Sequence, residues 1–117
     1  MNQPYAIVIE DDPKLSTIYQ TALQSAGFNT DVDMNGDKYQ ALLASAEPAL
    51  VILDLHLPYA SGVKVLDEIR EKYPQTIITV VTADFIQAKT INEKADHVLI
   101  KPVSVASLLR IAEAIKG

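Results

Sequence analysis

Residues 49–54 read Ala-Leu-Val-Ile-Leu-Asp, an uninterrupted run of aliphatic side chains that ends in a carboxylate. A short apolar run without polar alternation is typical of a strand that is buried on both faces. Such strands occur in parallel sheets that carry helices on both sides. We therefore expect residues 49–53 to be the central strand of a parallel sheet, with Asp54 at its carboxyl end.

The same unit, a short strand followed by a helical stretch, recurs along the chain. Strands are expected at residues 5–9, 28–33, 49–53, 77–81 and 98–100, and helices after Asp12-Pro13, Asn35-Gly36, the loop 55–61, Asp84 and Ser104. The second strand alternates in character, which predicts a half-exposed edge strand with Asn29, Asp31 and Asp33 on its polar face. The helix at residues 84–94 is expected to be weak. Strict alternation of strands and helices predicts an α/β fold with a five-stranded parallel sheet.

Composition narrows the class of protein further. The 117 residues, of which 49% are hydrophobic, suit one globular domain spanning residues 1–117. The absence of cysteine excludes disulfides and thiolate metal sites, and a net charge of −5 argues against direct binding of nucleic acid. No apolar run approaches the roughly 20 residues that cross a bilayer, and residues 1–4 do not resemble a signal peptide. We expect a cytoplasmic protein that does not enter the membrane.

Charged and hydroxyl side chains follow four of the five expected strands at the point where each strand ends. They are Glu10 and Asp11, Asp54, Thr82, and Lys101. Because the carboxyl ends of parallel strands share one edge of the sheet, these side chains should converge there. Asp33 ends the edge strand and is expected to lie too far away to join them.

This combination of side chains suits phosphoryl transfer. Three neighbouring carboxylates repel one another, and a hard divalent cation such as Mg²⁺ relieves that repulsion. Asp54 could then attack phosphorus and form an acyl phosphate. The Thr82 hydroxyl and the Ala83 N–H would donate hydrogen bonds to the transferred group, and Lys101 would neutralise its charge.

The full set of motifs resembles the response-regulator receiver domain of two-component signalling, the family that includes chemotaxis receivers. The residues that carry the resemblance are Glu10-Asp11, Asp54, Leu57-Pro58 with Gly62, Thr82-Ala83 and Lys101-Pro102. The resemblance covers the whole chain. It implies a flavodoxin-like (βα)5 sandwich with strand order 2-1-3-4-5 and a cis bond between Lys101 and Pro102.

The resemblance also implies roles for individual residues. Asp54 matches the phosphoacceptor, Thr82 the switch hydroxyl and Lys101 the lysine that contacts phosphate. The Mg²⁺ ligands would be Glu10, Asp11, Asp54 and the backbone carbonyl of His56. The phosphoryl donor would be a histidine kinase or a histidine phosphotransfer protein. The domain would catalyse only its own phosphorylation and dephosphorylation, and it would signal by a conformational change to an output partner that the sequence does not identify.

Three departures from the family pattern fall in one region. Val98 stands where the family usually has tyrosine or phenylalanine, and Lys94-Ala95 replaces a common Gly-Ala pair. Only nineteen positions separate Thr82 from Lys101, so the helix between them should be short. The family uses this region for output, and the resemblance allows a homodimer through the face made by residues 84–116.

Other interpretations of these residues remain open at this point. Asp12 and Asp84 suit helix caps better than catalysis, and His56 and His97 suit exposed loop positions. A flavodoxin-like cofactor binder lacks its phosphate-binding loop here, and a phosphohydrolase would need an acid where His56 stands. The main alternative is a degenerate receiver that acts as a phosphorylation-independent protein-interaction module.

Overall fold

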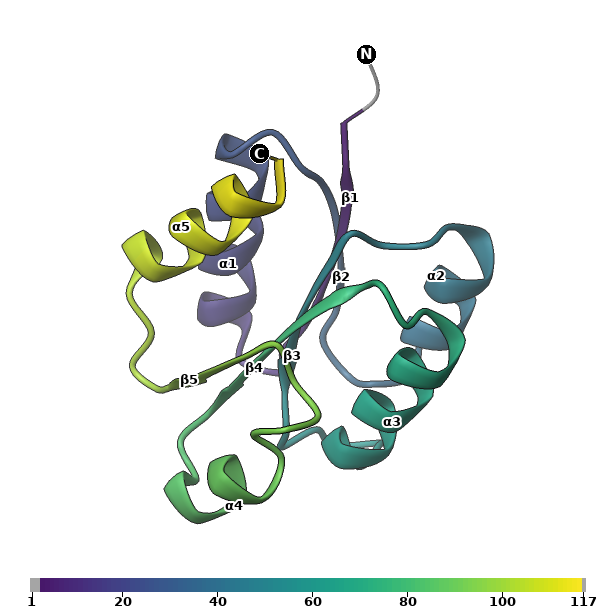
Figure 1. Ribbon diagram of the computed structural model, residues 1–117, viewed down its shortest axis with the longest axis vertical. Helices are drawn as coiled ribbons and strands as arrows, with labels where there is room; N and C mark the ends of the chain where they lie inside the picture. The colour runs from purple at the N-terminus through teal and green to yellow at the C-terminus, as the bar shows by residue number, and fades with distance from the viewer. Residues whose placement is uncertain (1–2, 117) are drawn as a thin grey trace.

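The computed structural model describes residues 3–116, which form three layers with a parallel sheet between two layers of helices (Figure 1). The strands are β1 (Tyr5–Ile9), β2 (Asn29–Asp33), β3 (Leu50–Asp54), β4 (Ile77–Thr82) and β5 (His97–Ile100). The helices are α1 (Pro13–Ser25), α2 (Tyr39–Ser45), α3 (Gly62–Lys72), α4 (Phe85–Thr90) and α5 (Val105–Lys116). The strand order β2-β1-β3-β4-β5 confirms the predicted flavodoxin-like topology, and all neighbouring strands are parallel.

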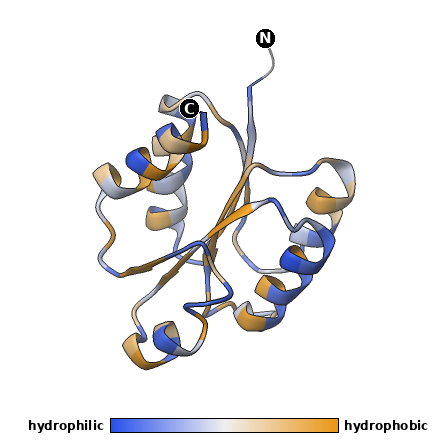
Figure 2. Ribbon diagram, in the orientation of Figure 1, coloured by the Kyte–Doolittle hydropathy of each residue, from blue (hydrophilic) through white to orange (hydrophobic). Residues whose placement is uncertain are grey.

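The core has two halves, one on each face of the sheet, as the hydrophobic strands at the centre of Figure 2 suggest. α1 and α5 cover one face, where Val8 and Ile52 pack against Leu108. α2, α3 and α4 lie on the other face, where Ile7 and Leu53 pack with residues of α3. Because β1 and β3 are buried on both faces, the residues that end them are held firmly in position. No helix within residues 3–116 has the length and apolar character needed to cross a membrane.

Asp33 corrects the expectation of a polar, exposed face on the second strand. Its side chain is fully buried and accepts hydrogen bonds from the backbone N–H groups of Asn35, Gly36, Lys38 and Tyr39. Burial alone would raise its pKa, but these four donors lower the pKa of Asp33 below its usual value. Asp33 therefore organises the loop into α2, and it stays outside the carboxylate cluster as expected.

α4 is shorter than the stretch 84–94 predicted from the sequence. The helix ends at Thr90, and the carbonyl of Ile91 accepts hydrogen bonds from the N–H groups of Lys94 and Ala95 in a following turn. Ile91 itself is buried, so the turn is fixed by packing its side chain into the core. The first residues of α4, Phe85 and Ile86, are 58% and 78% exposed.

Candidate functional site at the carboxyl edge of the sheet

The sheet brings the predicted side chains to one edge, as the sequence indicated. Register places Ile9 beside Leu53, Asp54 beside Val81 and Thr82 beside Ile100. The next residues along β1 and β5 are Glu10 and Lys101. Three of the site side chains, those of Glu10, Asp54 and Thr82, are buried, although each is polar or charged.

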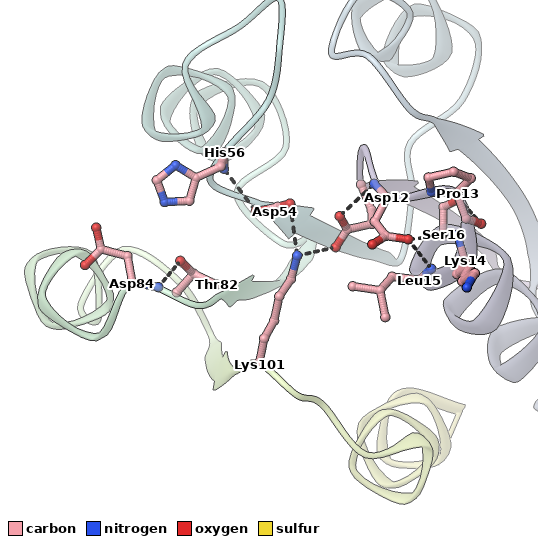
Figure 3. A network of polar contacts seen from close by, with 11 residues as sticks. Asp12, Pro13, Lys14, Leu15, Ser16, Asp54, His56, Thr82, Asp84 and Lys101 are labelled. Carbon is pink, nitrogen blue, oxygen red and sulfur yellow. Dashed lines mark hydrogen bonds and ion pairs between the residues drawn. The ribbon is translucent and has the colours of Figure 1, made fainter.

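Lys101 connects the carboxylates of two strands. Figure 3 shows its side chain extending from the end of β5 toward Asp54. Its Nζ lies 3.1 Å from Asp54 Oδ2 and 2.9 Å from Glu10 Oε1. Burial by itself would lower the pKa of Lys101, but contact with these two carboxylates raises it. The ammonium is therefore charged and shared between Glu10 and Asp54.

Glu10, Asp11 and Asp54 form a compact carboxylate cluster. One oxygen from each lies within 4.8 Å of the others. Burial, together with the nearby Asp54 carboxylate, raises the pKa of Glu10 to about 7. Glu10 Oε1 lies 2.9 Å from the Lys101 ammonium, which it shares with Asp54. Three crowded carboxylates that have a single ammonium between them suit a hard divalent cation, so these residues could hold Mg²⁺.

Asp12 does not belong to this cluster. Its Oδ1 accepts hydrogen bonds from the N–H groups of Lys14 and Leu15 at 2.8 and 3.1 Å, which confirms its role as the cap of α1. Its own N–H donates to Glu10 Oε2 at 3.2 Å. The cap thus also holds the buried glutamate in place.

Short backbone contacts position the remaining site residues (Figure 3). The N–H of His56 donates to Asp54 Oδ1 at 3.0 Å, while the His56 side chain is exposed. The N–H of Asp84 donates to the Thr82 hydroxyl oxygen at 3.0 Å, so that hydroxyl still has its proton to donate. Asp84 accepts from Gln87 N–H and caps α4, as predicted. The Lys101–Pro102 bond is cis, also as predicted.

Gly62 shapes the connection from β3 to α3. A side chain at this position would collide with the backbone of Leu55, because the first turn of α3 passes directly over the loop that follows Asp54. The loop is further closed by a bridge between His56 and Ser61. The glycine thus allows α3 to begin close behind Asp54.

Tyr19 of α1 lies in the core. Its apolar spacing on the first helix predicted a packing residue, and the buried ring confirms that prediction. Burial, and then the charge of Glu10, raise the pKa of Tyr19 to about 12.

Comparison with known proteins identifies the family. A model of the response regulator receiver domain matches residues 6–113. The chain belongs to this family. Receiver domains are signalling domains of two-component systems, and they bind Mg²⁺ at an acidic pocket of the kind formed by Glu10, Asp11 and Asp54.

Individual relatives agree with this assignment. The chain is 32% identical to the DNA-binding dual master transcriptional regulator RpaA of Synechocystis sp., over 96% of this chain and 48% of the relative. It is 28% identical to the phosphate regulon transcriptional regulatory protein PhoB of Rhizobium meliloti, over 95% of this chain and 51% of the relative. The chain therefore spans about half the length of these curated relatives.

One solved structure with a similar fold is a complex with Mg²⁺ and beryllium fluoride. The response regulator protein TrrA of Thermotoga maritima, in complex with Mg²⁺ and beryllium fluoride, is 26% identical and superposes with a TM-score of 0.84, covering 96% of this chain and 98% of the other. A receiver domain from Methanospirillum hungatei has a TM-score of 0.88 at 19% identity, over 98% of this chain and 95% of the other, which supports the fold alone.

Proposed function

We propose that Asp54 is the phosphoacceptor and takes a phosphoryl group from the phosphohistidine of a histidine kinase or histidine phosphotransfer protein. The observation that carries this proposal is the position of Asp54. It ends the central strand, is buried, and contacts Lys101 at 3.1 Å. A nucleophile beside a fixed ammonium suits a reaction in which negative charge is transferred.

In the proposed reaction an oxygen of Asp54 bonds to phosphorus while the bond from phosphorus to the donor histidine nitrogen breaks. The product is an acyl phosphate on Asp54, and water later hydrolyses it. Glu10, Asp11, Asp54 and the backbone carbonyl of His56 would hold Mg²⁺. The cation would neutralise negative charge on the phosphoryl oxygens.

The other site residues stabilise the transferred group in this proposal. Lys101 provides positive charge, because its Nζ already lies 3.1 Å from Asp54 Oδ2. The Thr82 hydroxyl keeps a proton to donate, because its oxygen already accepts from Asp84 N–H. The Ala83 N–H follows Thr82 at the same edge and would donate a second hydrogen bond. The domain then catalyses only its own phosphorylation and dephosphorylation.

We also propose the extent of the domain, its location in the cell and the partners of the protein. We place residues 1–117 in one receiver domain in the cytoplasm, where a phosphohistidine donor is available. The net charge of −5 gives no support to direct contact with nucleic acid. Exposed Phe85 and Ile100 lie on the α4–β5–α5 face, which a second copy of the chain could cover.

Intact-mass measurement after incubation with acetyl phosphate and Mg²⁺ tests the proposal. The wild-type protein should gain one phosphoryl group, and Asp54→Asn should gain none while keeping the same circular dichroism spectrum. Asp37→Asn is the matched control, because Asp37 is exposed in the loop before α2 and should leave uptake unchanged. Labelling of Asp54→Asn would assign the phosphoacceptor elsewhere. A folded wild type without uptake would favour the degenerate, phosphorylation-independent interaction module.

A further inference from the structure

Asp33 is a buried carboxylate at the end of β2 that lies outside the carboxylate cluster. Its Oδ1 accepts hydrogen bonds from the N–H groups of Asn35 and Gly36 at 3.0 and 2.9 Å. Its Oδ2 accepts from those of Lys38 and Tyr39 at 2.8 and 2.7 Å. Burial of a charge costs free energy unless such donors compensate for it. The four bonds therefore fix both the carboxylate and the backbone of the loop that leads into α2.

The loop into α2 lies against the loop between β3 and α3. The N–H of Tyr59 donates to the carbonyl of Asn35 at 3.3 Å, which joins the two loops. Gly36 is also close to the second loop, because a Cβ on this glycine would lie 3.1 Å from Ala60 Cβ and 3.3 Å from Leu57 Cδ1. The two residues of the first loop that make these contacts are the two that donate to Oδ1 of the buried carboxylate. That carboxylate therefore determines where the first loop meets the second.

The loop between β3 and α3 carries part of the candidate site. The N–H of His56 donates to Asp54 Oδ1 at 3.0 Å, and the carbonyl of His56 is the backbone ligand in the proposed Mg²⁺ site. Asp33 also contacts a second element of that site, because its backbone carbonyl accepts the N–H of Glu10 at 3.2 Å. The contacts of Asp33 thus lead to two of the proposed ligand positions.

We propose that Asp33 is a positioning residue for the cation site: by fixing the loop into α2 against the loop after β3, its carboxylate holds the His56 carbonyl in place for Mg²⁺. Groups that hold a metal ligand in position contribute to metal affinity although they do not touch the metal. Asp33 touches neither the cation nor a reacting atom and acts through the two loops. This inference rests on the Mg²⁺ site of the proposed function.

Asp33→Ala tests the inference, with Mg²⁺ alone as the probe. Affinity is measured by titration of the amide NMR signals of residues 54–57, well below the melting temperature, so that only folded protein contributes. Asp33→Ala should bind Mg²⁺ about tenfold more weakly than the wild type, the lower end of the loss seen when a group that supports a metal ligand is removed. A merely structural role would lower the melting temperature and leave the affinity of the folded protein unchanged.

Asp96→Ala is the matched control. Asp96 is also a carboxylate that accepts a backbone N–H, that of Ile78 at 2.8 Å, but Ile78 lies near the amino end of β4, at the opposite edge of the sheet. This variant should melt at a lower temperature and bind Mg²⁺ with wild-type affinity. Loss of stability alone is thereby separated from loss of the cation site.

Leu57→Ala tests whether Asp33 acts through the contact between the loops. This substitution removes side-chain atoms that lie beside Gly36 and leaves the buried carboxylate untouched. If the contact transmits the effect, Asp33→Ala should reduce Mg²⁺ affinity less in the Leu57→Ala protein than in the wild type. The same fold-reduction in both backgrounds would overturn the proposed route from Asp33 to the site.

Asp33→Asn keeps the size of the side chain and one acceptor oxygen, so its Mg²⁺ affinity should lie between those of the wild type and Asp33→Ala. It decides the question if Asp33→Ala does not fold. Wild-type affinity in a folded Asp33 variant, beside a wild type that binds Mg²⁺, would overturn the role of Asp33 alone. A wild type whose amide signals do not respond to Mg²⁺ would instead overturn the proposed cation site, and the inference with it.

Discussion

The carboxyl edge of the sheet and the segment from α4 to β5 are built in opposite ways. At the edge, Glu10, Asp54 and Thr82 are buried and follow strands of the core. In the segment, α4 has six residues, Phe85 and Ile86 are exposed, and β5 has no fully buried residue. The edge is fixed by hydrophobic burial, whereas in the segment only Ala88 and Ile91 are buried, so polar contacts carry more of the attachment.

Polar contacts to α3 hold the segment from α4 to β5. Arg70 donates to the carbonyl of Lys94 at 3.2 Å and pairs with Asp96 at 2.7 Å. Asp96 also accepts from the N–H of Ile78 at 2.8 Å. Lys94 itself pairs with Asp67 of α3 at 3.2 Å. Such contacts are easier to rearrange than a packed core, so we expect a conformational response in this segment and not at the edge that carries the chemistry.

The largest effect should come from removing one carboxylate at the edge. Mg²⁺ should raise the melting temperature of the wild type, because a ligand at 100 times its Kd stabilises a fold by about 2.7 kcal/mol. Asp11→Ala should lose most of this gain, because Asp11 belongs to the carboxylate cluster. Melting curves with and without Mg²⁺ measure the difference.

Asp12→Ala is the control for that experiment. It should keep the gain from Mg²⁺ but lose about 1 kcal/mol of stability without metal, because Asp12 caps α1. Equal losses of the Mg²⁺ effect in both variants would show that the cation site does not distinguish Asp11 from Asp12.

The second prediction concerns Asp96, which attaches the segment from α4 to β5 to Arg70 of α3 and to β4. Asp96→Ala should lower the free energy of unfolding by about 2 kcal/mol, because it leaves Arg70 and the Ile78 N–H without their shared acceptor. Asp67→Ala removes an exposed ion pair and should cost less than about 1 kcal/mol. Urea unfolding measures both. Equal stability of the two variants would mean that the segment does not depend on Asp96.

A smaller effect should appear as the pH is lowered. Burial alone would raise the pKa of Asp96, but hydrogen bonds from Ile78 N–H and Arg70 lower the pKa below its usual value. The stabilisation from Asp96 is therefore present above the unfolded pKa and is lost as pH falls through the lower folded pKa. The difference in stability between the wild type and Asp96→Ala should narrow below about pH 4. A difference independent of pH would contradict this assignment.

The sequence predicted the edge better than the segment for a physical reason. Buried parallel strands are encoded locally by apolar runs, so the positions of Asp54 and Lys101 followed from strand ends alone. The burial of Asp33 was missed because four N–H donors from the following loop outweigh its polarity. The pairing of Arg70 with Asp96 joins residues 26 positions apart, which no local pattern specifies.

The length of α4 also depends on contacts that a local sequence pattern does not specify. Thr90, Ile91 and Asn92 indicated a weak helix, and the weakness is real. The end point at Thr90 was not predictable, because it depends on burial of Ile91 against other elements of the core. Local helix propensity thus predicted a weak helix, and the packing of Ile91 in the core determined that the helix ends at Thr90.

Substitution of Val98 tests whether the segment from α4 to β5, and not the carboxyl edge of the sheet, responds to phosphorylation. Val98 lines a groove of about 350 Å³ together with Phe85, Ala88 and Ile100, at the position where receivers usually carry an aromatic ring. If Thr82 turns toward a phosphoryl group, the short β-branched side chain of Val98 is too small and too stiff to fill the space that Thr82 leaves. We therefore expect the segment itself to respond to phosphorylation.

Amide hydrogen exchange with and without beryllium fluoride and Mg²⁺ should show the largest change within residues 84–97. The expected change is local, because the sheet edge is held by the core while this segment is held by polar contacts. Val98→Tyr should move part of the response onto β5, because the groove between α4 and β5 has room for a ring that can turn. Val63→Tyr on α3 is the control for added bulk at a half-buried position away from the groove and should leave the pattern unchanged. Identical exchange of residues 84–97 in both states, with a response on another face, would place the conformational change outside this segment.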